Sequence, residues 1–118
     1  MNKYHNQKVT TGDGIVHDSR REAERWSQLK LLERVGKIVN LQRQVKFVLI
    51  PAQYDVPKGK QKRGKLLERE CSYIADFQYQ DKETGELVIE DTKGVRTKDY
   101  VIKRKLLLKE YGLKIKEV

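Results

Sequence analysis

The strongest constraint on the fold is a pair of neighbouring apolar segments, residues 71–80 and 86–92. The first has the sequence CSYIADFQYQ and the second ELVIEDT, and both are rich in aromatic or β-branched residues, as strands are. The polar connection DKETG between them is typical of a turn. We therefore expect the two segments to pair as a β-hairpin.

A helix and a strand are predicted before this hairpin. Ser19 is followed three residues later by Glu22, which is the spacing of a helix capping box. The helical pattern that starts there continues to Gly36. Residues 44–51, QVKFVLIP, are predicted to form a strand that Pro51 terminates.

A second helix and a last strand are predicted after the hairpin. Thr97 can cap a helix that runs to about Tyr111, and Gly112 is placed to end it. Residues 113–118 alternate as a short strand. The order α-β-β-β-α-β predicts an α/β fold with a mixed central sheet flanked by helices.

The length of 118 residues fits a single domain, residues 1–118. Within it we expect an irregular N-terminal arm, residues 1–18, and a mobile basic loop, residues 57–70. There is no apolar run of about 18 residues and no secretory signal pattern, so neither a membrane span nor a membrane partner is expected. A single cysteine, Cys71, excludes an internal disulfide framework. We expect a cytoplasmic protein, in a bacterial host cell if a phage encodes it.

The charge balance indicates a polyanionic partner. Lysine and arginine number 26 against 17 acidic residues, which gives a net charge of +9 and a pI near 9.7. Such an excess on a small domain is typical of nucleic-acid binding.

Two aspartates occupy unusual places in the predicted hairpin. Asp76 lies in the middle of the first strand, and Asp91 lies two residues before Lys93, so these two share one side of the second strand. If the register brings Asp76 near Asp91, the two carboxylates repel unless a cation lies between them, and Mg²⁺ or Mn²⁺ prefers such oxygen ligands. Glu90 points to the other side, but a one-residue bulge would put it in place of Asp91. The alternatives are a water-facing sheet for Asp76 and a surface ion pair for Asp91 and Lys93.

Glu22 is a third candidate acid. It lies on the same arc of the predicted helix as Ala23, Trp26 and Leu29, which is the face expected to pack on the sheet. Its alternative role is limited to the capping box. Lys93 beside a metal could orient water and stabilise charge that develops on a phosphate.

Three segments together resemble the PD-(D/E)XK nuclease superfamily: SRREAERW, YIADF and VIEDTKG. The resemblance extends over roughly residues 16 to 118, and it is closest to small phage and prophage proteins that include Holliday-junction resolvase-like nucleases. It implies a restriction-endonuclease-like core and Mg²⁺-dependent cleavage of DNA, with Mn²⁺ able to substitute. Ala75 stands where that family has proline, a position that carries no chemistry.

The resemblance also implies roles for individual residues. Asp76 and Asp91 would bind the metal together with the Thr92 backbone carbonyl, and Lys93 would be the catalytic lysine. Glu22 would bind or position the metal and water.

The implied substrate is branched DNA, such as a four-way junction in recombination, and a homodimer would supply two active sites for it. The alternatives are a PD-(D/E)XK nuclease of restriction, repair or transposition, and a nucleic-acid-binding module without catalysis. We expect the basic loop and the segment that follows Lys93 to contact phosphates. The alternative for the loop is a solvated tether. The candidate residues are Lys58, Lys60, Lys62, Arg63 and Lys65 in the loop, and Arg96, Lys98, Lys103 and Arg104 after Lys93.

Overall fold

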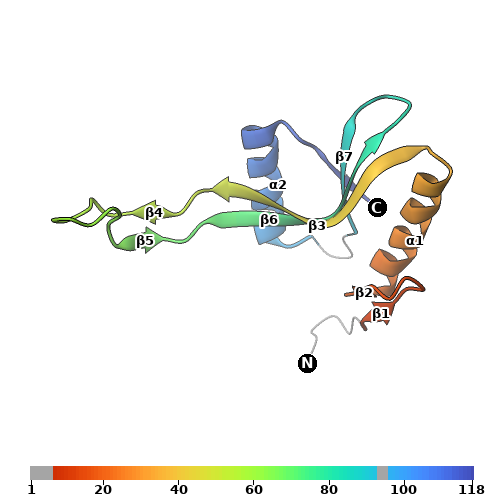
Figure 1. Ribbon diagram of the computed structural model, residues 1–118, viewed down its shortest axis with the longest axis horizontal. Helices are drawn as coiled ribbons and strands as arrows, with labels where there is room; N and C mark the ends of the chain where they lie inside the picture. Colours follow the sequence, from red (N-terminus) through yellow and green to blue (C-terminus); the bar gives the residue numbers. More distant parts are fainter. Residues whose placement is uncertain (1–6, 93–95) are drawn as a thin grey trace. The chain divides into compact units, whose positions relative to one another are not determined.

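The structure is a computed structural model that describes residues 7–92 and 96–118 (Figure 1). Its elements in chain order are β1 (Val9–Thr10), β2 (Val16–His17), α1 (Arg20–Arg34), β3 (Ile38–Ile50), β4 (Gln53–Tyr54), β5 (Leu66–Glu68), β6 (Cys71–Asp81), β7 (Leu87–Asp91), α2 (Lys98–Tyr111) and β8 (Ile115–Glu117).

The chain divides into two compact units, and β3 and β6 contribute residues to both. The first unit contains residues 1–45, 75–95 and 115–118, and the second contains residues 46–74 and 96–114.

The central sheet has the strand order β3-β6-β7-β8. Strands β6 and β7 are antiparallel, with Phe77 paired to Glu90 and Tyr79 paired to Val88, whereas β7 and β8 are parallel. The α/β class, the mixed sheet and the hairpin expected from the sequence are therefore confirmed. The polar turn between β6 and β7 is closed by the Gly85 amide, which donates to the Asp81 carbonyl at 2.7 Å.

The first helix, α1, begins where its cap predicts. The Ser19 hydroxyl accepts a hydrogen bond from the Glu22 backbone amide at 3.1 Å, which satisfies one of the free N–H groups of the first turn. Gly36 follows the helix with a φ of 81°, a conformation that glycine adopts without steric cost.

The core of the first unit lies between α1 and the sheet. Trp26 stacks on Phe77, with ring centroids 5.9 Å apart, and Leu29, Ile38 and Tyr79 complete the buried cluster. The alternation along β6 follows from this packing, because Tyr73, Ala75, Phe77 and Tyr79 are all buried while Ile74 is exposed.

The second unit is built on α2 and an aromatic cluster. Thr97 caps the helix by accepting from the Tyr100 amide at 3.1 Å, and Gly112 ends it with a φ of 69°, as predicted. Phe47 contacts both Tyr73 and Tyr111, at centroid distances of 6.5 and 5.5 Å.

Three parts of the chain have more regular structure than the sequence indicated. The strand expected at residues 44–51 begins earlier, at Ile38. The arm expected to be irregular contains the β1–β2 hairpin, and its residues 1–6 lie outside the described range. The basic loop expected at residues 57–70 contains strand β5, which pairs with β4. The strands β1, β2, β4 and β5 are only two or three residues long, so the local pattern gives little sign of them. No helix in the described ranges is both long enough and apolar enough to span a membrane.

Candidate metal and nucleic-acid sites

The β6–β7 register places the two candidate aspartates opposite each other. Phe77 pairs with Glu90, and the same register continued by one position brings Asp76 opposite Asp91. Residues opposite each other in antiparallel strands have side chains on the same face, about 5 Å apart at Cβ. Asp91 is almost completely buried and Asp76 is partly buried. The β6–β7 register, continued in this way, indicates that the acidic pair lies together in the first unit.

Thr92 fixes one member of the pair. Its backbone amide and its hydroxyl both donate to Oδ2 of Asp76, at 2.8 and 2.7 Å. Two donors on one oxygen hold the carboxylate in a single orientation. The sequence had suggested only a backbone carbonyl role for Thr92, so its contact with Asp76 is an addition.

Glu90 faces the opposite side of the sheet from Asp91. Its oxygens accept from Nε and Nη2 of Arg25, each at 2.7 Å, and the Tyr79 hydroxyl also donates to it. The hydrogen bond from Arg25 to Glu90 raises the pKa of Arg25, while burial and the same carboxylate raise the pKa of Tyr79. The carboxylate is fully buried and already satisfied as part of a structural ion pair.

Glu22 is buried at the start of α1, among polar neighbours. Its Oε1 lies 3.5 Å from Nδ1 of His17, accepts from Nε2 of Gln44 at 3.2 Å, and lies 3.8 Å from Nη2 of Arg43. Burial raises the pKa of Glu22, the negative charge of Asp76 raises it further, and the hydrogen bond with His17 opposes both. Glu22 is thus close enough to Asp76 for the two charges to interact.

Gln44 reaches Glu22 from a strained backbone position. Its φ is 53°, in the left-handed region that residues other than glycine rarely occupy. Such a conformation costs on the order of 1–3 kcal/mol and is commonest at functional sites. The strain at Gln44 accompanies an amide side chain that donates to the buried carboxylate.

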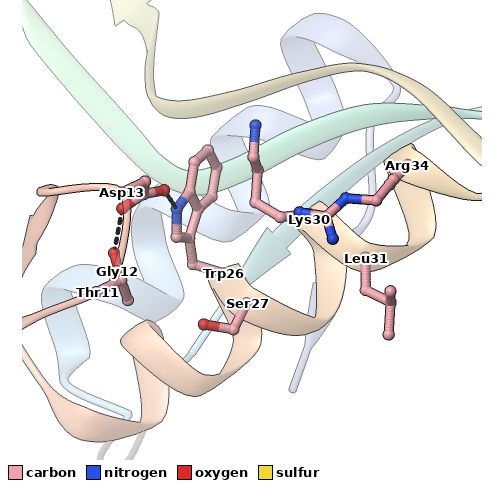
Figure 2. A pocket seen from close by; sticks show the side chains of 8 residues that line it. All are labelled: Thr11, Gly12, Asp13, Trp26, Ser27, Lys30, Leu31 and Arg34. Carbon is pink, nitrogen blue, oxygen red and sulfur yellow. Dashed lines mark hydrogen bonds between the residues drawn. The ribbon is translucent and has the colours of Figure 1, made fainter.

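The β1–β2 hairpin holds its own His17 through a series of hydrogen bonds, of which Figure 2 draws those of Asp13 with Thr11 and Trp26. His17 is fully buried, and its Nε2 lies 3.3 Å from the Thr11 hydroxyl, which in turn donates to Asp13. The other oxygen of Asp13 accepts from the Trp26 indole at 2.6 Å, as the dashed lines show. The hydrogen bonds from Thr11 and Trp26 lower the pKa of Asp13 to about 2. The hairpin is thus connected to α1 at Glu22 and at Trp26.

A hollow of about 450 Å³ opens between the same hairpin and α1 (Figure 2). Lys30 and Arg34 bring positive charge to it, beside the Trp26 ring. Its lining residues are Thr11, Gly12, Asp13, Trp26, Ser27, Lys30, Leu31 and Arg34. The candidate acids are not among them, so this hollow is separate from the acidic pair.

The acidic pair fits a hard cation in its chemistry. Oxygen ligands from one or two carboxylates, completed by water and phosphate oxygens, are typical of Mg²⁺ sites. Asp76 also raises the pKa of Glu22, so the negative charges of these two acids interact. Within residues 7–92 and 96–118, however, no group of three or more His, Cys, Asp and Glu side chains has the arrangement of a metal site. Lys93 lies outside the described residues.

The nine basic candidates all belong to the second unit. Lys58, Lys60, Lys62, Arg63 and Lys65 are exposed on the connection between β4 and β5. Arg96 precedes α2, and Lys98, Lys103 and Arg104 lie on it. Arg104 is partly buried against Tyr100, with its guanidinium 5.8 Å from the ring centroid.

Sequence reasoning missed His17 and Gln44 as neighbours of the candidate site. His17 lies five residues before Glu22 and two residues before the helix cap Ser19, but nothing in the sequence pairs it with Glu22. Gln44 had no local signal, because only the course of β3 brings it to the helix.

The fold and these residues together define a small mixed α/β protein with a facing pair of aspartates at the end of a hairpin. Residues 1–117 match the family described as "Protein of unknown function (DUF1064)", and the chain belongs to that family. No curated protein and no solved structure is significantly similar to it.

Proposed function

We propose that the protein is a metal-dependent DNA endonuclease with a restriction-endonuclease-like core, related to the PD-(D/E)XK superfamily. The observation that carries this proposal is the register that puts Asp76 opposite Asp91, with Thr92 holding Asp76. A surface ion pair needs no second, facing carboxylate and no such support. The basic net charge of +9 supports a polyanionic substrate.

In the proposed mechanism, Asp76 and Asp91 hold Mg²⁺, and Mn²⁺ substitutes for it. The bound ion would supply an activated water and would neutralise charge on the scissile phosphate. Glu22, near Asp76, positions water or metal, while His17 and Gln44 hold its carboxylate. Lys93 supports the nucleophile, as the sequence resemblance implies. The product retains a 5′-phosphate.

Asp91, and not Glu90, is the proposed ligand. Glu90 is occupied by Arg25 and Tyr79 on the opposite face of the sheet. The regular pairing from Gln80 to Phe77 also leaves no bulge that would exchange the two acids.

The proposed substrate is branched DNA such as a Holliday junction, cut by a homodimer. The test is a cleavage panel with Mg²⁺ in which a four-way junction, a flap and a linear duplex share one sequence. Junction cleavage that Asp91→Asn abolishes supports the proposal. Equal cleavage of the linear duplex would overturn the junction preference and favour a nuclease of restriction, repair or transposition.

A non-catalytic nucleic-acid-binding module is the second candidate. It is favoured by the lack of a three-ligand metal cluster among the described residues. On this alternative, wild type binds DNA without cutting any substrate, and EDTA and Asp91→Asn leave binding unchanged.

A further inference from the structure

Residues 53–68 form an arm that has no hydrophobic core of its own. It consists of β4, β5 and the connection at residues 55–65, and Figure 1 draws it as a narrow two-stranded ribbon beyond the ends of β3 and β6. Apart from Gly64, which is partly buried, every residue of the arm is exposed. Isolated two-stranded hairpins are marginally stable in water, so this arm gains most from a partner that covers it.

The arm nevertheless has a defined local shape. The Asp55 amide donates to the Lys65 carbonyl at 2.7 Å and closes the ribbon at the base of the connection. Gly64 approaches the opposite strand so closely that a Cβ atom there would lie 2.0 Å from the Asp55 carbonyl oxygen. Arg63 lies over the Tyr54 ring, 4.5 Å from its centroid, and joins the connection to β4.

The charge of the arm decides what kind of partner it fits. Residues 57–65 contain five basic residues and no acid, and these basic side chains are solvent-exposed. The whole arm, residues 53–68, also contains Asp55 and Glu68, so two copies placed together would bring a net charge of +3 against +3, which disfavours self-association. A polyanion is the complementary partner.

The shape of the arm narrows the choice of polyanion. The major groove of B-form DNA admits a two-stranded β-ribbon, whereas the minor groove is about half as wide. The ribbon exposes apolar side chains that suit base edges such as the thymine methyl, namely Tyr54, Val56, Leu66 and Leu67.

We propose that the arm enters the major groove of duplex DNA and that the lysines and arginine of its connection contact the flanking phosphates. This inference rests on the proposed function, which names DNA as the partner. It adds an element that binds DNA whether or not metal is present and whether or not the DNA is cut. The arm anchors the duplex, while the acidic residues of the other unit carry the chemistry.

The test is a footprint of the full chain on a linear duplex in EDTA, with dimethyl sulfate as the probe. We expect protection of guanine N7 in the major groove. An arm variant with Lys58, Lys60, Lys62, Arg63 and Lys65 changed to Gln should lose it. The slope of log affinity against log salt should fall by up to about 4.5, because each phosphate contact contributes about 0.9.

Two controls separate charge from shape. The matched variant removes five exposed lysines outside the arm, Lys37, Lys82, Lys105, Lys109 and Lys114, and should keep the footprint. Gly64→Val keeps every charge but forces the ribbon open at Asp55, and it should lose N7 protection. Circular dichroism should show that all three variants fold, since none of the changed side chains belongs to the buried core.

Three results would overturn the proposal: an arm variant that binds like the matched control, protection of adenine N3 in the minor groove in place of guanine N7, or tighter binding of single strands than of duplex. Failure of the nuclease proposal gives a different pattern, in which no substrate is cut with Mg²⁺ while the N7 footprint in EDTA persists.

Discussion

Thr92 holds Asp76 through two hydrogen bonds to a single carboxylate oxygen, from its backbone amide at 2.8 Å and its hydroxyl at 2.7 Å. The two residues are 16 positions apart: Asp76 lies in the middle of β6, and Thr92 directly follows β7. The arrangement leaves Oδ1 of Asp76 as the oxygen that these two bonds do not engage.

The Thr92 hydroxyl can be removed without changing the size of the side chain. Thr92→Val should lower stability by about 1 kcal/mol, the usual contribution of one hydrogen bond. It should also weaken metal binding or activity by about 10–100-fold, as changes in residues that orient metal ligands do. Mg²⁺ titration of cleavage and calorimetric Mn²⁺ binding would measure this. Thr92→Ser keeps the hydroxyl and should behave like wild type, and a Val variant with unchanged metal affinity would contradict the proposed orientation of Asp76.

Substitution of Glu90 should lower the stability of the fold, whereas substitution of Asp91 should abolish cleavage. Glu90→Ala leaves the Arg25 charge without its buried partner and should destabilise the fold by about 3–5 kcal/mol. Asp91→Asn should abolish cleavage with little change in stability. Denaturant unfolding combined with cleavage assays separates the two effects, and a stable but inactive Glu90→Gln protein would indicate that Glu90 is the ligand after all.

His17 should strengthen metal binding through its contact with the Glu22 carboxylate. His17→Ala removes a buried contact to the Glu22 carboxylate, so the Mg²⁺ concentration for half-maximal cleavage should rise about tenfold or more. His17→Gln retains a polar group and should recover part of this loss. Calorimetric Mn²⁺ binding gives a second measurement that does not depend on turnover. Equal metal affinity in wild type and His17→Ala would show that His17 only fills space.

Asp13 should contribute stability that depends on pH. Its pKa is lowered from 3.8 to about 2 in the folded protein, so the folded state favours the charged form. This contribution is fully present above pH 4 and is lost as the pH falls towards 2. The difference in Tm between wild type and Asp13→Asn should therefore be constant from pH 5 to 7 and should shrink below pH 4. A difference that does not change down to pH 2 would exclude this linkage.

The sequence by itself determined the local elements of this protein. The caps at Ser19 and Thr97, the end of α2 at Gly112 and the alternation along β6 are set by residues within one or two turns of each other or along a single strand. The position of Asp76 and Asp91 in one hairpin also followed from the turn between the two strands, whereas the nuclease role and the role of Lys93 stay predictions.

The tertiary structure alone decided which polar groups surround the candidate acids. Glu90 and Asp91 are adjacent and similar in sequence, and only the packing of α1 supplies Arg25 to one of them. His17 and Gln44 reach Glu22 because a hairpin and a strained strand bring them there. Long-range hydrogen bonds between buried groups leave no periodic signal in the sequence, since their partners are fixed by packing and not by spacing.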